Sequence, residues 1–190
     1  MRILAIQGSP RKAGNTATVL DMFESHLSSG HTVERVNVVD FDIKGCTGCG
    51  ACQRVMDAPG CVQKDDAPGL FEREIEADAV VLATPLYGWS FSAQIKPLID
   101  RQICMTKGYG TDQYMSLVAG KPLALLVTCG GPVENNADVI QTTFERMADF
   151  LRCCAVGTYV VPFCTDPGKL GDDAARTVRQ MAADITACAS

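Results

Sequence analysis

Residues Arg2–Ser28 read RILAIQGSPRKAGNTATVLDMFESHLS. A short apolar run ends at Gln7 and is followed by a Gly-Ser-Pro turn signal and a polar loop. Apolar residues then recur at helical spacing, at Val19, Leu20, Phe23 and Leu27, which predicts a helix over Thr16–Ser28. A strand, a glycine-containing loop and a helix in this order begin a βαβ unit.

The same order repeats along the chain. Further strands are predicted over Thr32–Val39, Ala79–Thr84, Pro122–Thr128 and Val156–Val161. Further helices are predicted from Asp65 or Asp66 to about Glu76, with Pro68 in the first turn, and over Ser92–Cys104, Asn135–Arg152 and Asp173–Cys188. The strands are mostly continuous apolar runs, typical of a parallel sheet covered on both faces. One doubly wound α/β domain over residues 1–190, with a cysteine-rich loop at about 45–63, accounts for the sequence.

Composition limits the function classes. The chain has 190 residues, 47% of them hydrophobic, and a net charge of −5. This charge argues against nucleic acid or an anionic membrane as a partner, because both select basic surfaces. The N-terminal apolar run is too short for a signal peptide, and the longest apolar stretches have only strand length. We therefore expect a cytoplasmic protein without a membrane span.

In doubly wound sheets, ligands bind beyond the carboxyl ends of the strands. The loop after the first predicted strand offers the polar groups of Ser9, Asn15 and Thr16, the charges of Arg11 and Lys12, and a helix start that favours a phosphate. It lacks both the nucleotide-hydrolysing P-loop motif and the Rossmann fingerprint, so a monophosphate is the expected ligand. The alternative is an ordinary turn in which Arg11 and Lys12 are merely solvated.

GSPRKAGNT resembles the phosphate loop of NADPH-dependent FMN reductases and iron–sulfur flavoproteins of the flavodoxin-like superfamily. TPLYGWSFSAQIKPLIDR (Thr84–Arg101) is similar to the second flavin loop of that family and the helix after it. With GCTGCGAC and the KDD that follows, the resemblance covers roughly the first 105 residues, and the last third agrees in pattern only. It implies a flavodoxin-like sheet of strand order 2-1-3-4-5, bound FMN, NAD(P)H as electron donor, and a homodimer or homotetramer.

Two further loops are candidates for flavin contact. The second contains Pro85, Leu86, Tyr87, Gly88 and Trp89, and the resemblance implies that it borders the isoalloxazine; the alternative is that its aromatic residues are simply packed. The third contains Cys129, Gly130 and Gly131. Cys129 is either a loop residue near the flavin or an inert buried thiol, and the absence of a nearby His or Lys in the sequence favours the inert thiol.

No catalytic side chain is expected. His26 and His31 both lie outside the candidate loops, so a Ser/His/Asp or Cys/His hydrolase is excluded. In flavin chemistry the cofactor carries the reaction. The helix predicted over Ser92–Cys104 carries Lys96, Asp100 and Arg101, which form either a subunit interface or a solvated, salt-bridged face.

Four of the ten cysteines fall within 16 residues, as Cys46-x2-Cys49-x2-Cys52-x8-Cys61, and glycines occupy positions 45, 48 and 50. The spacing resembles the motif that holds a four-iron–four-sulfur cluster in iron–sulfur flavoproteins. Three explanations stay open: a cluster, a tetrahedral zinc site, and free or redox-active thiols. The other six cysteines are scattered along the chain: Cys104, Cys129, Cys153, Cys154, Cys164 and Cys188. Most of these six are interpreted as small buried hydrophobic residues.

The leading interpretation is an FMN-dependent oxidoreductase that passes electrons from NAD(P)H to flavin, a quinone or another small-molecule or protein acceptor. The alternative is an iron–sulfur flavoprotein that carries electrons for a ferredoxin-like partner. A third hypothesis is a non-redox binding module whose cysteine loop is stapled by zinc.

Overall fold

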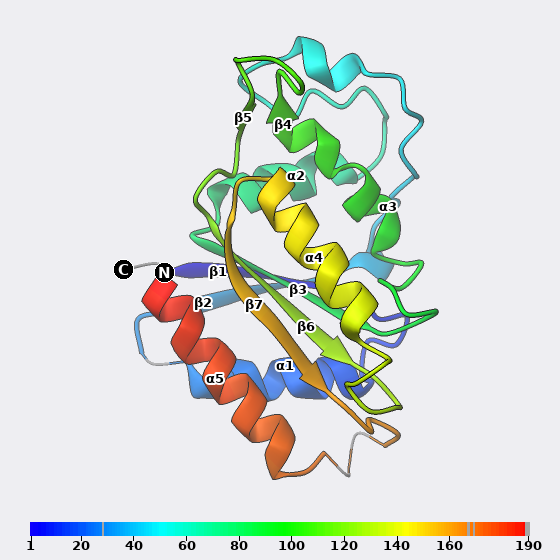
Figure 1. Cartoon of the computed structure of the whole chain (residues 1–190), viewed down its shortest axis with the longest axis vertical. Coiled ribbons are helices and arrows are strands. Elements are labelled where there is room, and N and C mark those ends of the chain that lie inside the picture. The colour runs from blue at the N-terminus through cyan, green and yellow to red at the C-terminus, as the bar shows by residue number, and fades with distance from the viewer. Residues whose placement is uncertain (28, 167, 169, 189–190) are drawn as a thin grey trace.

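The computed structural model of the chain describes residues 1–27, 29–166, 168 and 170–188. Five parallel strands form one sheet in the order β2-β1-β3-β6-β7 (Figure 1). The sheet strands are β1 (Arg2–Gln7), β2 (Thr32–Asn37), β3 (Ala79–Pro85), β6 (Pro122–Thr128) and β7 (Cys154–Val161). Because β6 and β7 are the fourth and fifth strands of this sheet, the predicted order 2-1-3-4-5 is confirmed.

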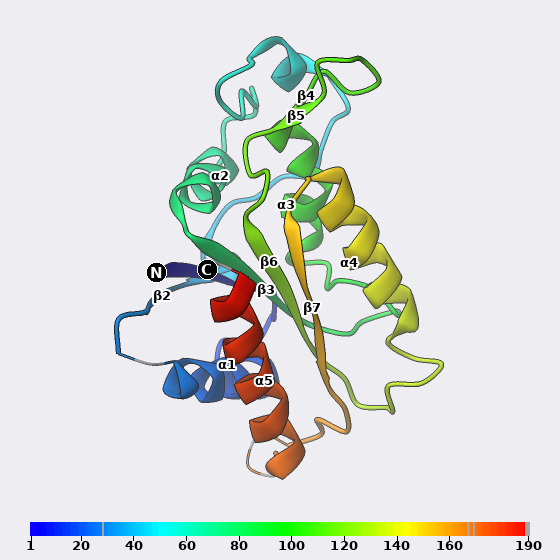
Figure 2. The same ribbon diagram turned by 60° about the vertical axis from the view of Figure 1, so that its left-hand side comes forward.

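Helices cover both faces of the sheet (Figure 1, Figure 2). They are α1 (Asn15–His26), α2 (Ala67–Glu76), α3 (Lys96–Asp100), α4 (Asp138–Phe150) and α5 (Asp172–Cys188). Helices α1 and α5 pack on one face, and α2, α3 and α4 on the other. None of the described helices is both long and apolar enough to cross a lipid bilayer.

The central strands explain why the apolar runs lack alternation. Every residue of β3 and β6 is buried. Leu82 packs into the core beneath α2 and α4, whereas its neighbour Val81 packs into the core beneath α1 and α5. Fully burying such a side chain contributes roughly 1.5–3 kcal/mol, so both faces must be apolar.

Two predicted helices are longer than the observed ones. The helix expected over Asn135–Arg152 spans only Asp138–Phe150, because Asn135 and Arg152 have φ values of 55° and 53°, which a right-handed helix excludes. The helix expected over Ser92–Cys104 is divided into α3 and the 3₁₀ helix η3 (Gln102–Met105). Ser92 belongs to the preceding loop, where its backbone N–H donates to Thr84 Oγ1 at 3.1 Å.

Smaller differences occur at other element ends. The strand expected over Thr32–Val39 ends at Asn37, and Val38–Asp40 forms a 3₁₀ turn. The first helix ends at His26, and the predicted end at Ser28 lies outside the described residues. Helix α2 confirms its prediction, with Pro68 in the first turn, and the Asp65 carboxylate accepts a hydrogen bond from the N–H of Ala67 at 3.3 Å.

The cysteine loop and a short hairpin form a lobe that stands above the sheet in both views (Figure 1, Figure 2). The hairpin strands, β4 (Thr106–Lys107) and β5 (Met115–Ser116), are too short to leave a pattern in the sequence and were not predicted. Gln53 Nε2 in the cysteine loop donates to the carbonyl oxygens of Ile103 and Thr106, at 3.0 and 2.9 Å. These bonds fasten the loop to the chain that leads into the hairpin.

Glu74 of α2 makes the stability of this fold depend on pH. Its carboxylate accepts two hydrogen bonds from Gln102 Nε2, at 2.9 and 3.0 Å, yet burial raises the pKa of Glu74 to about 7. In the unfolded chain a glutamate has a pKa of about 4.3, so between these values the folded state binds more protons. The free energy of unfolding should therefore fall by up to about 3 kcal/mol as pH rises from about 4.3 to about 7.

Glu74→Gln is expected to remove this loss and to leave the protein more stable than the parent at pH 8. Urea unfolding of the apoprotein at pH 5 and pH 8 measures the effect. Glu72→Gln, an exposed position on the same helix, is the matched control. Equal pH dependence in the parent and Glu74→Gln would contradict the prediction.

Candidate cofactor site and cysteine cavity

The loop between β1 and α1 is held tightly at the carboxyl edge of the sheet. The close approach of this loop to Ile95 requires a glycine at position 8, because a Cβ there would lie only 2.7 Å from Ile95 Cβ. Gln7 Nε2 donates to the carbonyl oxygens of Arg11 and Lys12, at 3.5 and 3.4 Å, and Ser9 Oγ accepts from the N–H of Arg11 at 3.1 Å. The loop thus has a fixed curvature set by the strand before it.

The N-terminus of α1 is suited to an anion. Its N-cap is Gly14, which has no side chain to cap the first turn, and Asn15–Thr18 contain no acidic residue. Helix N-termini leave N–H groups without intrahelical partners and carry a partial positive charge. The predicted residues Ser9, Asn15 and Thr16 are all buried around this point, and they fit a phosphate and its attached polyol.

Asn15 shows that the loop has unused hydrogen-bonding capacity. Its Nδ2 donates to the carbonyl oxygen of Cys164 at 2.6 Å, and its buried Oδ1 finds no partner among the described residues. A hydroxyl donor of a bound ligand would satisfy such an oxygen. Thr16 Oγ1 lies 2.8 Å from Thr128 Oγ1, which joins this loop to the end of β6.

The two charged residues of the loop are exposed, unlike Ser9, Asn15 and Thr16. Arg11 is exposed, and Lys12 forms an exposed ion pair with Asp40, beyond the end of β2. Lys12 is thus engaged by a partner that the sequence pattern did not indicate.

The loop after β3 makes a tight two-residue turn. Tyr87 and Ser90 exchange backbone hydrogen bonds of 3.1 and 3.2 Å, with Gly88 and Trp89 between them at φ values of 55° and 59°. A left-handed backbone is ordinary for glycine but costs a tryptophan of order 1 kcal/mol. Tyr87 is 44% exposed and Trp89 60% exposed, so the alternative of packed aromatics is wrong for both side chains.

The second and third candidate loops meet at one pocket of about 220 Å³. The backbone N–H of Leu86 donates to the carbonyl oxygen of Thr128 at 2.9 Å, which joins the two loops. Cys129 is 4% exposed, and burial raises the pKa of its thiol, as expected of an inert thiol. The pocket is lined by Leu86, Gly88, Trp89, Cys129, Gly130, Gly131 and Asn136.

Trp89 provides a direct test of this pocket, because it is the chain's single tryptophan. FMN added to the apoprotein is expected to quench most of its emission. Trp89→Gly should relieve about 1 kcal/mol of backbone strain and weaken FMN binding about tenfold, because an aromatic contact is lost. Trp89→Phe should keep the affinity. Unchanged emission on stoichiometric FMN binding would contradict the placement of this loop beside the flavin.

The four clustered cysteines line a single cavity of about 150 Å³ in the upper lobe. Cys46 and Cys49 are exposed, Cys61 is half-buried and Cys52 is buried. Gly48 and Gly50, with φ values of 67° and 66°, give the chain the left-handed turns that bring successive cysteines to this wall. Within the described residues, no three His, Cys, Asp or Glu side chains are close enough together to bind one metal ion. The four thiols instead lie around the wall of the cavity.

An N–H or O–H group lies next to each of the four sulfur atoms. The N–H of Gly48 donates to Cys46 Sγ at 3.5 Å and Arg101 Nη2 to Cys61 Sγ at 3.3 Å. Gln53 Nε2 lies 3.6 Å from Cys52 Sγ, while its two N–H groups bind the carbonyl oxygens of Ile103 and Thr106. The backbone of Ala51 and the hydroxyl of Thr47 lower the pKa of Cys49. Donors directed at sulfur stabilise thiolates, the form that binds metal.

Sequence reasoning missed two residues of this cavity. Cys104 lines it as a fifth thiol, and burial together with the Cys52 and Cys61 sulfurs raises the pKa of Cys104 to about 12. Arg101 was expected in an interface or on a solvated face, and it is instead buried in the cavity wall, whereas Lys96 and Asp100 do form an exposed ion pair. Only the folded chain brings these residues to the cysteine loop.

The remaining cysteines follow the expectation in part. Cys129 is buried, and Cys153 and Cys164 are half-buried free thiols. Cys154 and Cys188 differ, because they are joined as a disulfide between the start of β7 and the end of α5. Their separation of 34 residues gave no signal in the sequence.

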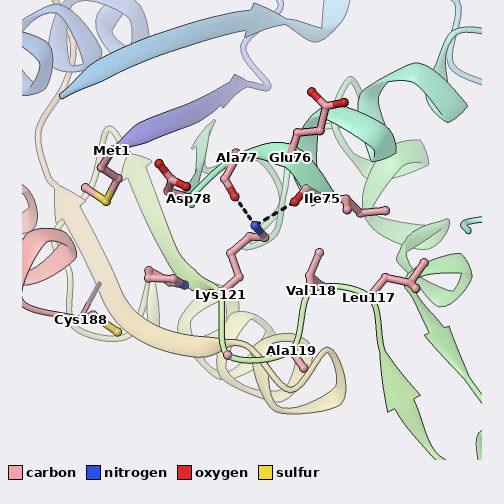
Figure 3. Close-up of a pocket in the computed structure, with 12 residues that line it drawn as sticks. Met1, Ile75, Glu76, Ala77, Asp78, Leu117, Val118, Ala119, Lys121 and Cys188 are labelled. Carbon is pink, nitrogen blue, oxygen red and sulfur yellow. Dashed lines mark hydrogen bonds between the residues drawn. The ribbon is translucent and has the colours of Figure 1, made fainter. Parts of the chain in front are cut away.

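A hollow of about 650 Å³, larger than either of the two pockets described above, lies at the opposite, amino ends of β3 and β6 (Figure 3). Lys121 extends across it and donates to the carbonyl oxygens of Ile75 and Ala77. None of the site residues predicted from the sequence lines it. Size alone therefore does not identify the functional site.

Residues 1–183 match the family described as NADPH-dependent FMN reductase. The chain belongs to this family. It is therefore an FMN-dependent oxidoreductase, and the three loops at the carboxyl edge of its sheet form the candidate FMN site.

Two curated relatives from Archaeoglobus fulgidus are each named iron-sulfur flavoprotein. One is 33% identical over 97% of this chain and 79% of its own length, and the other is 40% identical over 53% and 48%. The solved NAD(P)H:quinone oxidoreductase from Methanothermobacter marburgensis is 20% identical with a TM-score of 0.67, covering 99% of this chain and 94% of that one. That likeness confirms the fold.

Proposed function

We propose that this FMN reductase family member draws electrons from NAD(P)H, delivers them to a flavin, quinone or other small-molecule or protein acceptor, and holds a four-iron–four-sulfur cluster in its cysteine cavity. The observation that supports the cluster is that Cys46, Cys49, Cys52 and Cys61 line one cavity, each sulfur with an N–H or O–H group beside it. Soft thiolate donors of this kind suit iron–sulfur clusters.

At the other site, bound FMN would supply the exchange between hydride and single-electron transfer. The residues of the chain bind and orient it. Ser9, Asn15, Thr16 and the N-terminus of α1 would hold the phosphate and ribityl chain. Tyr87 and Trp89 would border the ring, and the exposed Gly130 would leave its edge open to a donor.

Helix α3 links the two sites. The Ser92 hydroxyl before it donates to the carbonyl oxygen of Gly8 in the phosphate loop, and Arg101 after it donates to Cys61 Sγ. One short segment therefore positions both sites relative to each other.

A second candidate is an electron carrier that works with a ferredoxin-like partner, favoured by the names of the curated relatives. Stopped-flow reduction of the purified protein discriminates between the two. Fast flavin bleaching by NAD(P)H supports the reductase. Bleaching only by a reduced ferredoxin-like protein supports the carrier.

The proposal is tested by anaerobic purification, a visible spectrum, and assays of iron, sulfide and zinc on one sample. Flavin bands with about four irons and four sulfides per chain would support the cluster. Flavin with stoichiometric zinc, or with no metal, would overturn the cluster and leave an FMN reductase with a zinc staple or free thiols. No flavin, even after FMN is added, would overturn the flavin site.

We also propose a cytoplasmic homodimer or homotetramer. Eight of the ten cysteines are free thiols against one disulfide, Cys154–Cys188, and this excess supports a reducing compartment. Sedimentation equilibrium of the FMN-loaded protein tests the oligomeric state, and a monomer would contradict it.

A further inference from the structure

Two buried cations lie close to the clustered cysteines: Arg101 lines their cavity, and Lys107 binds the backbone of two residues that line it. Arg101 is 1% exposed and Lys107 0% exposed. Arg101 directs its two terminal nitrogens differently: Nη1 donates to Asp65 Oδ2 and to the carbonyl oxygen of Lys44, and Nη2 donates to Cys61 Sγ at 3.3 Å. The guanidinium thus connects a buried carboxylate to one of the four clustered sulfurs.

Lys107 approaches the cavity from the hairpin side. Its Nζ donates to the carbonyl oxygens of Cys52, Pro59 and Cys104, at 2.9, 3.1 and 2.8 Å. Three acceptors match the three N–H groups of an ammonium. Within the described part of the chain Lys107 forms no ion pair, and Asp57 acts on it only at longer range.

The two cations differ in how their charge is offset. Asp65 offsets one of the two cations, and its pKa is lowered because hydrogen bonds from Arg101 and from the Lys44 N–H outweigh the effect of burial. Lys107 has no carboxylate in ion-pair contact among the described residues, and a buried cation of this kind favours a nearby anion. Four thiolates around an iron–sulfur core carry a net negative charge, which fits this wall.

We propose that Arg101 and Lys107 are positioning residues that raise the reduction potential of the centre held by the four cysteines, Arg101 through its hydrogen bond to Cys61. This inference rests on the proposed cluster. Reduction adds one negative charge to the centre, and nearby buried cations stabilise the reduced form more than the oxidised form. Hydrogen bonds to the sulfurs act in the same direction.

The test is a redox titration of anaerobically purified holoprotein, followed by the visible and electron paramagnetic resonance signals of the cluster. Because Arg101→Gln alone would leave Asp65 buried and unpaired, it is combined with Asp65→Asn. Lys107→Met is the second variant and keeps the shape of the side chain. Lys107→Met removes a net positive charge and is expected to lower the equilibrium constant for cluster reduction at least tenfold, a shift of about 59 mV to lower potential for a one-electron couple. The double variant leaves the net charge unchanged and removes the hydrogen bond to Cys61 Sγ, so its potential is expected to shift in the same direction by a smaller amount.

Lys121→Met is the matched control. Lys121 also donates to two backbone carbonyl oxygens, those of Ile75 and Ala77 (Figure 3), but neither of these residues lines the cysteine cavity. Its variant should leave the cluster potential unchanged. Unchanged potential in iron-replete Arg101→Gln/Asp65→Asn and Lys107→Met would overturn the inference while leaving the proposed function intact. Parent protein without iron would overturn both, and the iron assay reports this before any titration.

Discussion

Cys52→Ser is expected to reduce the iron and sulfide content from about four of each per chain to below about one. Cys52 is the most deeply buried of the four clustered cysteines, and its sulfur faces the shared cavity. A serine hydroxyl keeps the size of the side chain but does not ionise at neutral pH, so it is a poor replacement for a soft thiolate. Iron and sulfide assays, with the loss of broad absorption while the flavin bands remain, measure the effect.

Cys104→Ala is the control for this experiment, because Cys104 lines the same cavity. Its sulfur has no hydrogen-bond donor among the described residues, and a pKa raised to about 12 keeps it a neutral thiol. The variant should retain its iron and lose only about 1 kcal/mol of stability from the small void. Loss of iron in Cys104→Ala would make Cys104 a ligand, and full iron in Cys52→Ser would contradict a cluster held at this cavity.

Gly14→Asp is expected to weaken FMN binding about a hundredfold while leaving the apoprotein as stable as the parent or slightly more stable. Gly14 is the N-cap of α1, with an extended backbone that any residue can adopt. An aspartate there is a favourable helix cap, and its carboxylate would occupy the place proposed for the phosphate. Repulsion between the two anions weakens binding without unfolding the helix.

Gly14→Ser distinguishes the effect of the aspartate charge on FMN affinity from the steric effect of adding a side chain. It places the same Cβ 3.2 Å from Arg11 Cβ and also caps the helix, but it carries no charge. FMN affinity by calorimetric titration, with thermal unfolding of both apoproteins, completes the comparison. Equal loss of affinity in the serine and aspartate variants would indicate steric damage, and unchanged affinity in both would place the phosphate elsewhere.

The sheet, the three loops at its carboxyl edge and the cysteine segment could all be predicted from the amino-acid sequence. These features are local: an apolar run predicts a buried strand, a glycine loop before a helix predicts an anion site, and cysteines three residues apart can face one centre. The predicted loop residues Ser9, Asn15 and Thr16 are indeed gathered at the start of α1.

The residues that complete the two sites became visible only in the folded chain. Lys12 pairs with Asp40, Arg101 joins Asp65 to Cys61, and Lys107 reaches Cys52, each across a gap in the sequence that no local pattern spans. The ends of α4 were likewise fixed by Asn135 and Arg152, whose left-handed backbone follows from packing rather than from side-chain periodicity. The spacing of apolar residues along the sequence indicates which face of a helix or strand is buried. A buried charged side chain needs a partner to stabilise it, and that partner is usually distant in sequence and comes close only in the folded protein.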